Sequence, residues 1–105
     1  MEVHIVSQHG SGTDNNVTLV EETSVGNIKV HYEDSQTVEY SRASIIEATS
    51  ATGMSVTIVS QRGSGTDKNV KKIEELDEPN LYRVEYFDDT PAEYSDASIT
   101  KIIEE

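Results

Sequence analysis

The chain has 105 residues with no cysteine, no tryptophan, one phenylalanine and two prolines. Without cysteine, disulfide bonds, thiolate catalysis and cysteine-ligated zinc or iron–sulfur sites are excluded, so packing alone must stabilise the fold. No apolar run approaches the length that crosses a bilayer, and the first residues lack the basic start and apolar stretch of a secretion signal. We therefore expect a soluble cytoplasmic protein.

Basic residues are also scarce, because eight Lys and Arg face twenty Asp and Glu and the net charge is −12. Residues 1–53 contain eight acids and two bases, and residues 54–105 contain twelve and six, so both parts have the same acidic excess. Such a chain would be repelled by nucleic-acid phosphates and by anionic membranes. We expect a basic protein or peptide as partner, with no direct nucleic acid and no membrane. The alternative is that the acidity serves solubility or adaptation to salt.

An internal repeat is the clearest feature of the sequence. Shifted by 53 positions, residues 3–14 lie over residues 56–67 with ten of twelve positions identical. The match slips by one residue around positions 77–80, and residues 39–45 then lie over residues 93–99. A change of one residue inside a strand would turn every later side chain to the wrong face, so we expect it in a loop.

The repeat predicts two units with a short connector between them. We assign residues 1–49 to a first β-barrel repeat, 50–53 to a small, polar linker, and 54–105 to a second β-barrel repeat. The second copy begins with Met54, as a separate protein would begin with its initiator methionine. This is consistent with duplication of an ancestral homodimeric protein. We expect an approximate two-fold relation between the copies, in a monomer with pseudo-dimeric repeats or a homodimer.

Apolar and polar residues alternate within each unit, which is typical of half-buried strands. In the first copy this pattern predicts strands around Val3–Ile5, Val17–Leu19, Ile28–Tyr32 and Val38–Tyr40. Turn-forming residues occur at positions 10–14, 25–27 and 33–36. The stretch 41–48 is ambiguous between a short helix and a helical turn followed by a last strand, and we favour the turn and strand.

Five short strands in about 50 residues, with the segments Lys29–Asp34 and Arg83–Asp89 each followed by Glu-Tyr-Ser, resemble small barrels of the Tudor and KOW type. The resemblance covers the second half of each unit. It implies an all-β fold of two tandem five-stranded small barrels, Tudor/KOW-like and Src-homology-like. A barrel of this size buries little surface by itself, and packing of one copy against the other would stabilise both.

The Tudor resemblance also implies an aromatic cage for methylated Lys or Arg, held by cation–π attraction and a carboxylate. The positions that match are Tyr32, Asp34 and Tyr40 in the first copy and Tyr86, Asp88 and Tyr94 in the second. The chain departs from the family pattern because it has no Trp and only two tyrosines in the first copy. Packing of these tyrosines within the fold is the competing interpretation.

Other possible sites have plainer explanations. The Gly-Ser-Gly-Thr-Asp segments at 10–14 and 63–67 lack the Gly-Lys-Ser/Thr ending of a phosphate loop, so we interpret them as hairpin turns. His4 and His31 could approach across neighbouring strands and form a metal site with Glu33 or Asp34, but we favour the interpretation that they are surface histidines without a role. No strand-turn-helix segment supports a Ser-His-Asp arrangement.

Carboxylates surround the tyrosines in both copies. Alternate residues of a strand share a face, so outward carboxylates would form acidic rows with a spacing of about 6–7 Å, comparable to phosphates along a nucleic-acid strand. A solvated face is the alternative. The residues concerned are Glu21, Glu22, Glu33, Asp34, Glu39, Glu74, Glu75, Asp77, Glu78, Glu85, Asp88, Asp89 and Glu93.

These observations favour a non-enzymatic, acidic binding protein that engages a basic protein surface, with nucleic-acid mimicry or inhibition as the mechanism. A Tudor-like reader of a cationic or methylated peptide is the first alternative, and a small metal-dependent enzyme is the second. We expect no catalytic, cofactor or metal site. The expected partner-binding residues are Glu33, Asp34, Glu39, Tyr40, Glu85, Tyr86, Asp88, Asp89, Glu93 and Tyr94.

Overall fold

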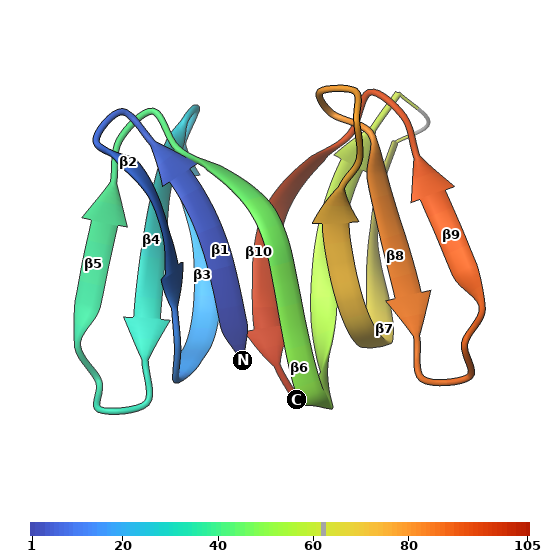
Figure 1. The fold of residues 1–105 in the computed structure, drawn as a ribbon, viewed down its shortest axis with the longest axis horizontal. Helices are drawn as coiled ribbons and strands as arrows, with labels where there is room; N and C mark the ends of the chain where they lie inside the picture. The colour runs from blue at the N-terminus through green and yellow to red at the C-terminus, as the bar shows by residue number, and fades with distance from the viewer. Residues whose placement is uncertain (62) are drawn as a thin grey trace.

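The structure is a computed structural model that describes residues 1–61 and 63–105, and these residues form an all-β fold without a helix (Figure 1). Ten strands pair into one open antiparallel sheet in the order β5-β4-β3-β10-β6-β7-β8-β9, and β1 pairs with β2 and β6. The strands are β1 (Glu2–Ser7), β2 (Gly10–Asp14), β3 (Val17–Ser24), β4 (Asn27–Tyr32), β5 (Thr37–Tyr40), β6 (Ser44–Ser60), β7 (Gly63–Glu75), β8 (Tyr82–Tyr86), β9 (Pro91–Tyr94) and β10 (Ser98–Glu104).

The strands predicted from alternation are confirmed as β1, β3, β4 and β5. Val3 and Ile5 are buried while their neighbours are more exposed, which is the expected period of two. In β3 the pattern shifts, because the pairing with β4 changes register between Val17 and Leu19. This irregularity buries Val17 and Val20 and leaves Leu19 partly exposed, so the simple alternation expected at Val17–Leu19 does not hold there.

The expectation of two separate closed barrels is not confirmed, because the sheet is open and continuous from one copy to the other. The long strand β6 contains both the last strand of the first copy and the first strand of the second copy. The last strand of each copy lies between the first strand of its own copy and the third strand of the other copy. Thus β10 pairs with the second part of β6 and with β3, and the first part of β6 pairs with β1 and with the end of β7. A single cluster of buried side chains extends through both copies.

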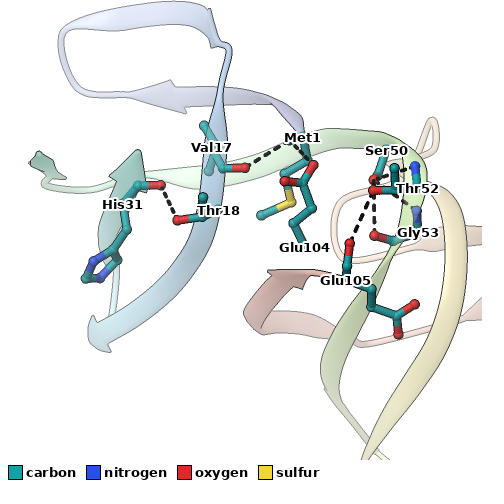
Figure 2. Close-up of polar contacts among 9 residues, drawn as sticks. All are labelled: Met1, Val17, Thr18, His31, Ser50, Thr52, Gly53, Glu104 and Glu105. Carbon is teal, nitrogen blue, oxygen red and sulfur yellow. Dashed lines mark hydrogen bonds and ion pairs between the residues drawn. The ribbon is translucent and has the colours of Figure 1, made fainter. Parts of the chain in front are cut away.

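Residues 50–53, expected as a linker, lie inside β6, which turns sharply at this point along the lower side of the molecule (Figure 1). The pairing of β6 with β7 changes register between Thr49 and Met54. The Ser50 hydroxyl accepts hydrogen bonds from the N–H groups of Thr52 and Gly53 and donates to the Gly53 carbonyl at 3.1 Å (Figure 2). Gly53 has φ of 107°, a conformation that other residues rarely adopt.

The turns of the two copies share backbone conformations at equivalent positions. Asn16 and Asn69 both have φ of 59°, and Arg42 and Asp96 have φ of 51° and 49°. The one-residue length difference falls between β3 and β4 and between β7 and β8, so its prediction in a loop is confirmed. The predicted helical turn at 41–48 is wrong: Arg42 adopts the left-handed conformation and β6 begins at Ser44, although the strand that we favoured there is present.

The prediction that the glycine-rich segments form hairpin turns is also wrong. Residues 10–14 form β2 and residues 63–67 form the beginning of β7, and Ser7 pairs directly with Gly10. Gly12 and Gly65 pair with the buried Ile5 and Ile58 and have no other heavy atom within 4 Å of the place a Cβ would occupy. Gly12 and Gly65 therefore lie in strands and not in turns. Because glycine has no side chain, the side of each strand that faces the core has no side chain at these positions.

Candidate functional site: two tyrosine–aspartate clefts and two acidic turns

Each copy contains a hydrogen bond between the tyrosine of a terminal strand and an aspartate. The Tyr40 hydroxyl at the end of β5 donates to Asp14 Oδ2 at 2.9 Å, and Tyr94 at the end of β9 donates to Asp67 Oδ2 at 2.8 Å. Tyr40 and Asp14 are 26 residues apart in the sequence. Their hydrogen bond joins β5, at the edge of the sheet, to the end of β2. It links two strands that have no backbone pairing with each other.

A second tyrosine lies beside each of these bonds. Burial raises the pKa of Tyr32 above its usual range, and its hydrogen bond with Tyr40 and the nearby negative charge of Asp14 act in the same direction. Burial, followed by the charge of Asp67, does the same for the pKa of Tyr86. Both phenols are therefore neutral at physiological pH and serve as hydrogen-bond donors.

An open cleft lies between the strands joined by each tyrosine–aspartate bond. We call the cleft between β2 and β5 the first seam: it has a volume of about 250 Å³ and is lined by the glycine-rich strand, Ile5, Ser7, His9 and Tyr40. The second seam, between β7 and β9, has a volume of about 210 Å³ and is lined by Ile58, Ser60, residues 63–65, Asp67 and Tyr94. The seams form where the inner side of the glycine strand has no side chains.

The expected carboxylate partner of the tyrosines, Asp34, has a different role. Asp34 Oδ1 accepts the N–H of Gln36 at 3.1 Å, and Asp88 Oδ1 accepts the N–H of Thr90 at 3.1 Å. Hydrogen bonds from Thr90 also lower the pKa of Asp88. The carboxylates that contact the tyrosines are Asp14 and Asp67, which the sequence did not identify as site residues. Their only signal was that the segment Gly-Ser-Gly-Thr-Asp is identical in both copies.

Four of the predicted partner-binding residues form two exposed acidic turns. Glu33 and Asp34 lie between β4 and β5, and Asp88 and Asp89 lie between β8 and β9. These turns lie on the same, lower side of the molecule near opposite ends of its longest axis (Figure 1). That axis measures 33 Å. Asp89 contacts Lys71 Nζ at 3.1 Å, but its side chain remains 83% exposed.

Several of the other predicted carboxylates lie on strands and have basic neighbours, so the expectation of purely acidic rows is wrong. One row of paired positions across β5, β4, β3 and β10 contains Glu39, Lys29, Glu21 and Lys101. The equivalent row across β9, β8, β7 and β6 contains Glu93, Arg83, Glu74 and Glu47. Glu85 likewise pairs with Lys72. Opposite charges at these paired positions partly compensate one another. Eight further carboxylates lie outside the strands, in turns and at the C-terminal end.

The histidines do not assemble as the metal hypothesis requires. His31 Nε2 contacts Glu21 Oε2 at 2.7 Å, whereas His4 Nδ1 contacts Thr13 Oγ1 at 2.9 Å. His4 is on β1 and His31 is on β4, and these strands are not neighbours in the sheet. Within residues 1–61 and 63–105, no group of three or more His, Cys, Asp or Glu side chains is placed to hold a metal ion. Arg62, the counterpart of His9, lies outside the described residues.

A hollow of about 630 Å³ lies beside the bend of β6 and is lined by residues of both copies. Figure 2 shows the polar contacts of several lining residues, among them Met1, Ser50 and Glu104. Four of the hollow's five charged groups form ion pairs, and Glu2 has none among the described salt bridges. The N-terminal ammonium of Met1 contacts Glu104 and donates to the Val17 carbonyl, and Lys72 contacts Glu74 at 3.2 Å. The hollow therefore presents mostly compensated charges, in contrast to the acidic turns.

A comparison with protein-family models, curated proteins and solved structures finds no match for this chain. Over the part of the chain that the structure describes, no helix is long and apolar enough to span a membrane. The residues themselves are therefore the basis for any proposal about function.

Proposed function

We propose that this chain is a non-enzymatic acidic binding protein that engages a basic protein surface. The observation that supports this most is the distribution of charge. Several carboxylates on the strands, such as Glu21, Glu39 and Glu85, have basic neighbours. In contrast, Glu33, Asp34 and Asp88 lie in exposed turns without an ion-pair partner among the described salt bridges. Exposed charges of one sign accelerate association with a complementary surface and make it sensitive to salt.

Nucleic-acid mimicry is the mechanism that we propose for this binding. The two acidic turns lie on one side of the molecule near the ends of a 33 Å axis. One helical turn of B-form DNA is about 34 Å long, so a groove that binds one turn of a duplex has the length to accommodate both acidic turns. Occupation of such a groove would inhibit the target by excluding its nucleic acid.

Two charge variants of equal net charge test the proposal. The turn variant combines Glu33→Gln, Asp34→Asn and Asp88→Asn, and the amide oxygens of the new Asn residues still accept the capping hydrogen bonds. The control variant combines Glu22→Gln, Asp77→Asn and Glu78→Gln, three exposed carboxylates near the end of β3 and between β7 and β8. The end of β3 and the β7–β8 connection lie on the opposite, upper side of the molecule (Figure 1).

The wild type and both variants serve as bait for proteins from the native host at low and at high salt. We expect basic nucleic-acid-binding proteins to be captured at low salt by the wild type and by the control variant, and DNA or RNA to compete with them. Capture should fall for the turn variant and at high salt. Equal capture by both variants, or a captured set without basic proteins, would refute the proposal.

A second candidate function is that of a reader of a cationic or methylated peptide. The specific observation in its favour is that two tyrosines and one aspartate meet in each copy, at Tyr86, Tyr94 and Asp67 in the second. This function predicts that Tyr86→Ala or Tyr94→Ala abolishes peptide binding, with little effect of salt. Strong salt dependence that persists in both tyrosine variants would favour the acidic-turn mechanism instead.

A further inference from the structure

The second seam is bordered by two strand edges that have no partner. In residues 63–67, β7 pairs with β6 on one side, and no described strand pairs with its other side. Across the seam, β9 pairs with β8, and no other described strand pairs with it. In an antiparallel pair every second residue directs its N–H and C=O away from the partner, so the first part of β7 offers backbone groups for one more strand.

The space beside this edge is not filled by side chains. Gly63 and Gly65 have no heavy atom within 4 Å of the place where a Cβ would lie. A further cleft of about 230 Å³, lined by Ser60, Gln61, Glu93, Tyr94 and Ser95, adjoins the second seam and shares two of its residues. An extended chain that lies beside β7 and β9 would have both clefts within reach.

The charge of the second seam identifies the kind of chain that fits it. Asp67 lines it, Glu93 lines the adjoining cleft, and Asp96 follows the lining residue Ser95. An extended segment with Lys or Arg would meet negative charge along this path. A second copy of this protein, with a net charge of −12, would be repelled.

We propose that the second seam binds an extended basic segment of the partner by strand addition to the first part of β7. This inference rests on the proposed function and specifies how part of the partner is held. Main-chain hydrogen bonds to β7 give affinity, and Lys or Arg side chains directed at Asp67, Glu93 and Asp96 give specificity. The acidic turns contact the remainder of the basic surface.

The first seam is less suited to the same ligand and supplies an internal comparison. Arg42 stands at the position equivalent to Asp96, so a positive charge replaces a negative one. We expect a basic segment to prefer the second seam.

The test uses an eight-residue peptide of alternating Arg and Thr, with a peptide of alternating Glu and Thr as the charge control. Amide hydrogen exchange and NMR chemical shifts of the full chain are recorded with each peptide. We expect the basic peptide alone to slow exchange of alternate amides in residues 63–67 and to shift the Tyr94 signals. A basic peptide that is N-methylated at alternate residues loses backbone donors and should bind at least tenfold more weakly.

Two substitutions exchange the charge of the seams. Asp96→Arg gives the second seam the charge found in the first and should weaken the basic peptide at least fivefold. Arg42→Asp leaves the second seam unchanged, so protection of β7 should persist in it. Both positions are exposed, and the variants keep the tyrosine–aspartate bonds intact.

The outcomes separate this inference from the proposed function. If the peptide binds without protecting β7, or binds equally well when N-methylated, strand addition is refuted while binding of basic ligands stands. If basic proteins are captured through the acidic turns but the peptide does not bind, the seam is again refuted alone. If neither basic proteins nor the peptide bind, both proposals fail.

Discussion

Replacement of Ile102 by alanine tests the way the two copies share one sheet. Ile102 is fully buried on β10, where it pairs with Val20 of the first copy and with Val56 of the second. A buried Ile→Ala substitution costs about 2–5 kcal/mol, because transfer free energy is lost and a cavity remains. Since a small domain has a total stability of about 5–15 kcal/mol, this is a large fraction of it.

The adjacent residue provides the matched control. Ile103 lies on the same strand, faces the other way and is 41% exposed, so Ile103→Ala should cost well under about 1 kcal/mol. We expect a cost of about 3 kcal/mol for Ile102→Ala, which corresponds to a fall of roughly 12–24 °C in the unfolding midpoint. Thermal and urea unfolding measure both variants. Equal losses for the two variants, or a loss below about 1 kcal/mol for Ile102→Ala, would refute the shared core.

Three further predictions concern stability. Residues 1–53 and 54–105 expressed as separate chains should each fail to fold as a monomer, because each lacks a strand partner from the other copy. When the two chains are mixed, the circular dichroism signal of β-strands should return. A stably folded monomeric half would contradict the pairing of strands between the copies. Burial raises the pKa of Tyr82 to about 12, so the unfolded chain loses this proton at lower pH than the folded chain does. The free energy of unfolding should therefore fall between about pH 10 and 12. Tyr82→Phe should make that decline less steep, and a pH profile unchanged by the substitution would contradict this prediction. Gly53→Ala should lower the free energy of unfolding by about 1–2 kcal/mol, because φ at this residue is 107°. Gly12→Ala should change it by no more than about 0.5 kcal/mol, because the added methyl group meets open space. Urea unfolding compares the two variants, and equal effects would contradict this prediction.

Local patterns in the sequence were sufficient to predict most strands. Alternation at Val3 and Ile5 or at Ile28 and Val30 depends only on the two-residue period of a strand and on which face is buried. The repeat also located the one-residue length difference in a loop, because such a change is tolerated only there. All-β character followed from these two observations together.

The sequence did not predict how the copies combine, because pairing between distant strands leaves no local pattern. Nothing in residues 17–24 indicates that β10 will be their neighbour, and residues 50–53 have the composition of a linker although β6 continues through them. The expectation of two barrels came from treating each copy as complete. In the structure each copy completes the sheet of the other.

The candidate site was predicted in part. The acidic turns at Glu33 and Asp88 lie on the surface, where turn composition places such residues. The contact between Tyr40 and Asp14 was not predicted, since the glycine-rich segment was interpreted as a hairpin turn. Glycine composition favours turns on average, but here the missing side chains leave a cleft beside an edge strand.

The central claim is that the acidic turns hold a basic partner by charge. The most direct measurement is the affinity of a captured, purified basic partner at several salt concentrations for the wild type, the turn variant and the control variant. Three exposed charge contacts contribute about 0.5 kcal/mol each, so the turn variant should bind about tenfold more weakly at low salt and depend less steeply on salt. The control variant should match the wild type. Identical affinities and salt slopes for all three proteins would contradict the account.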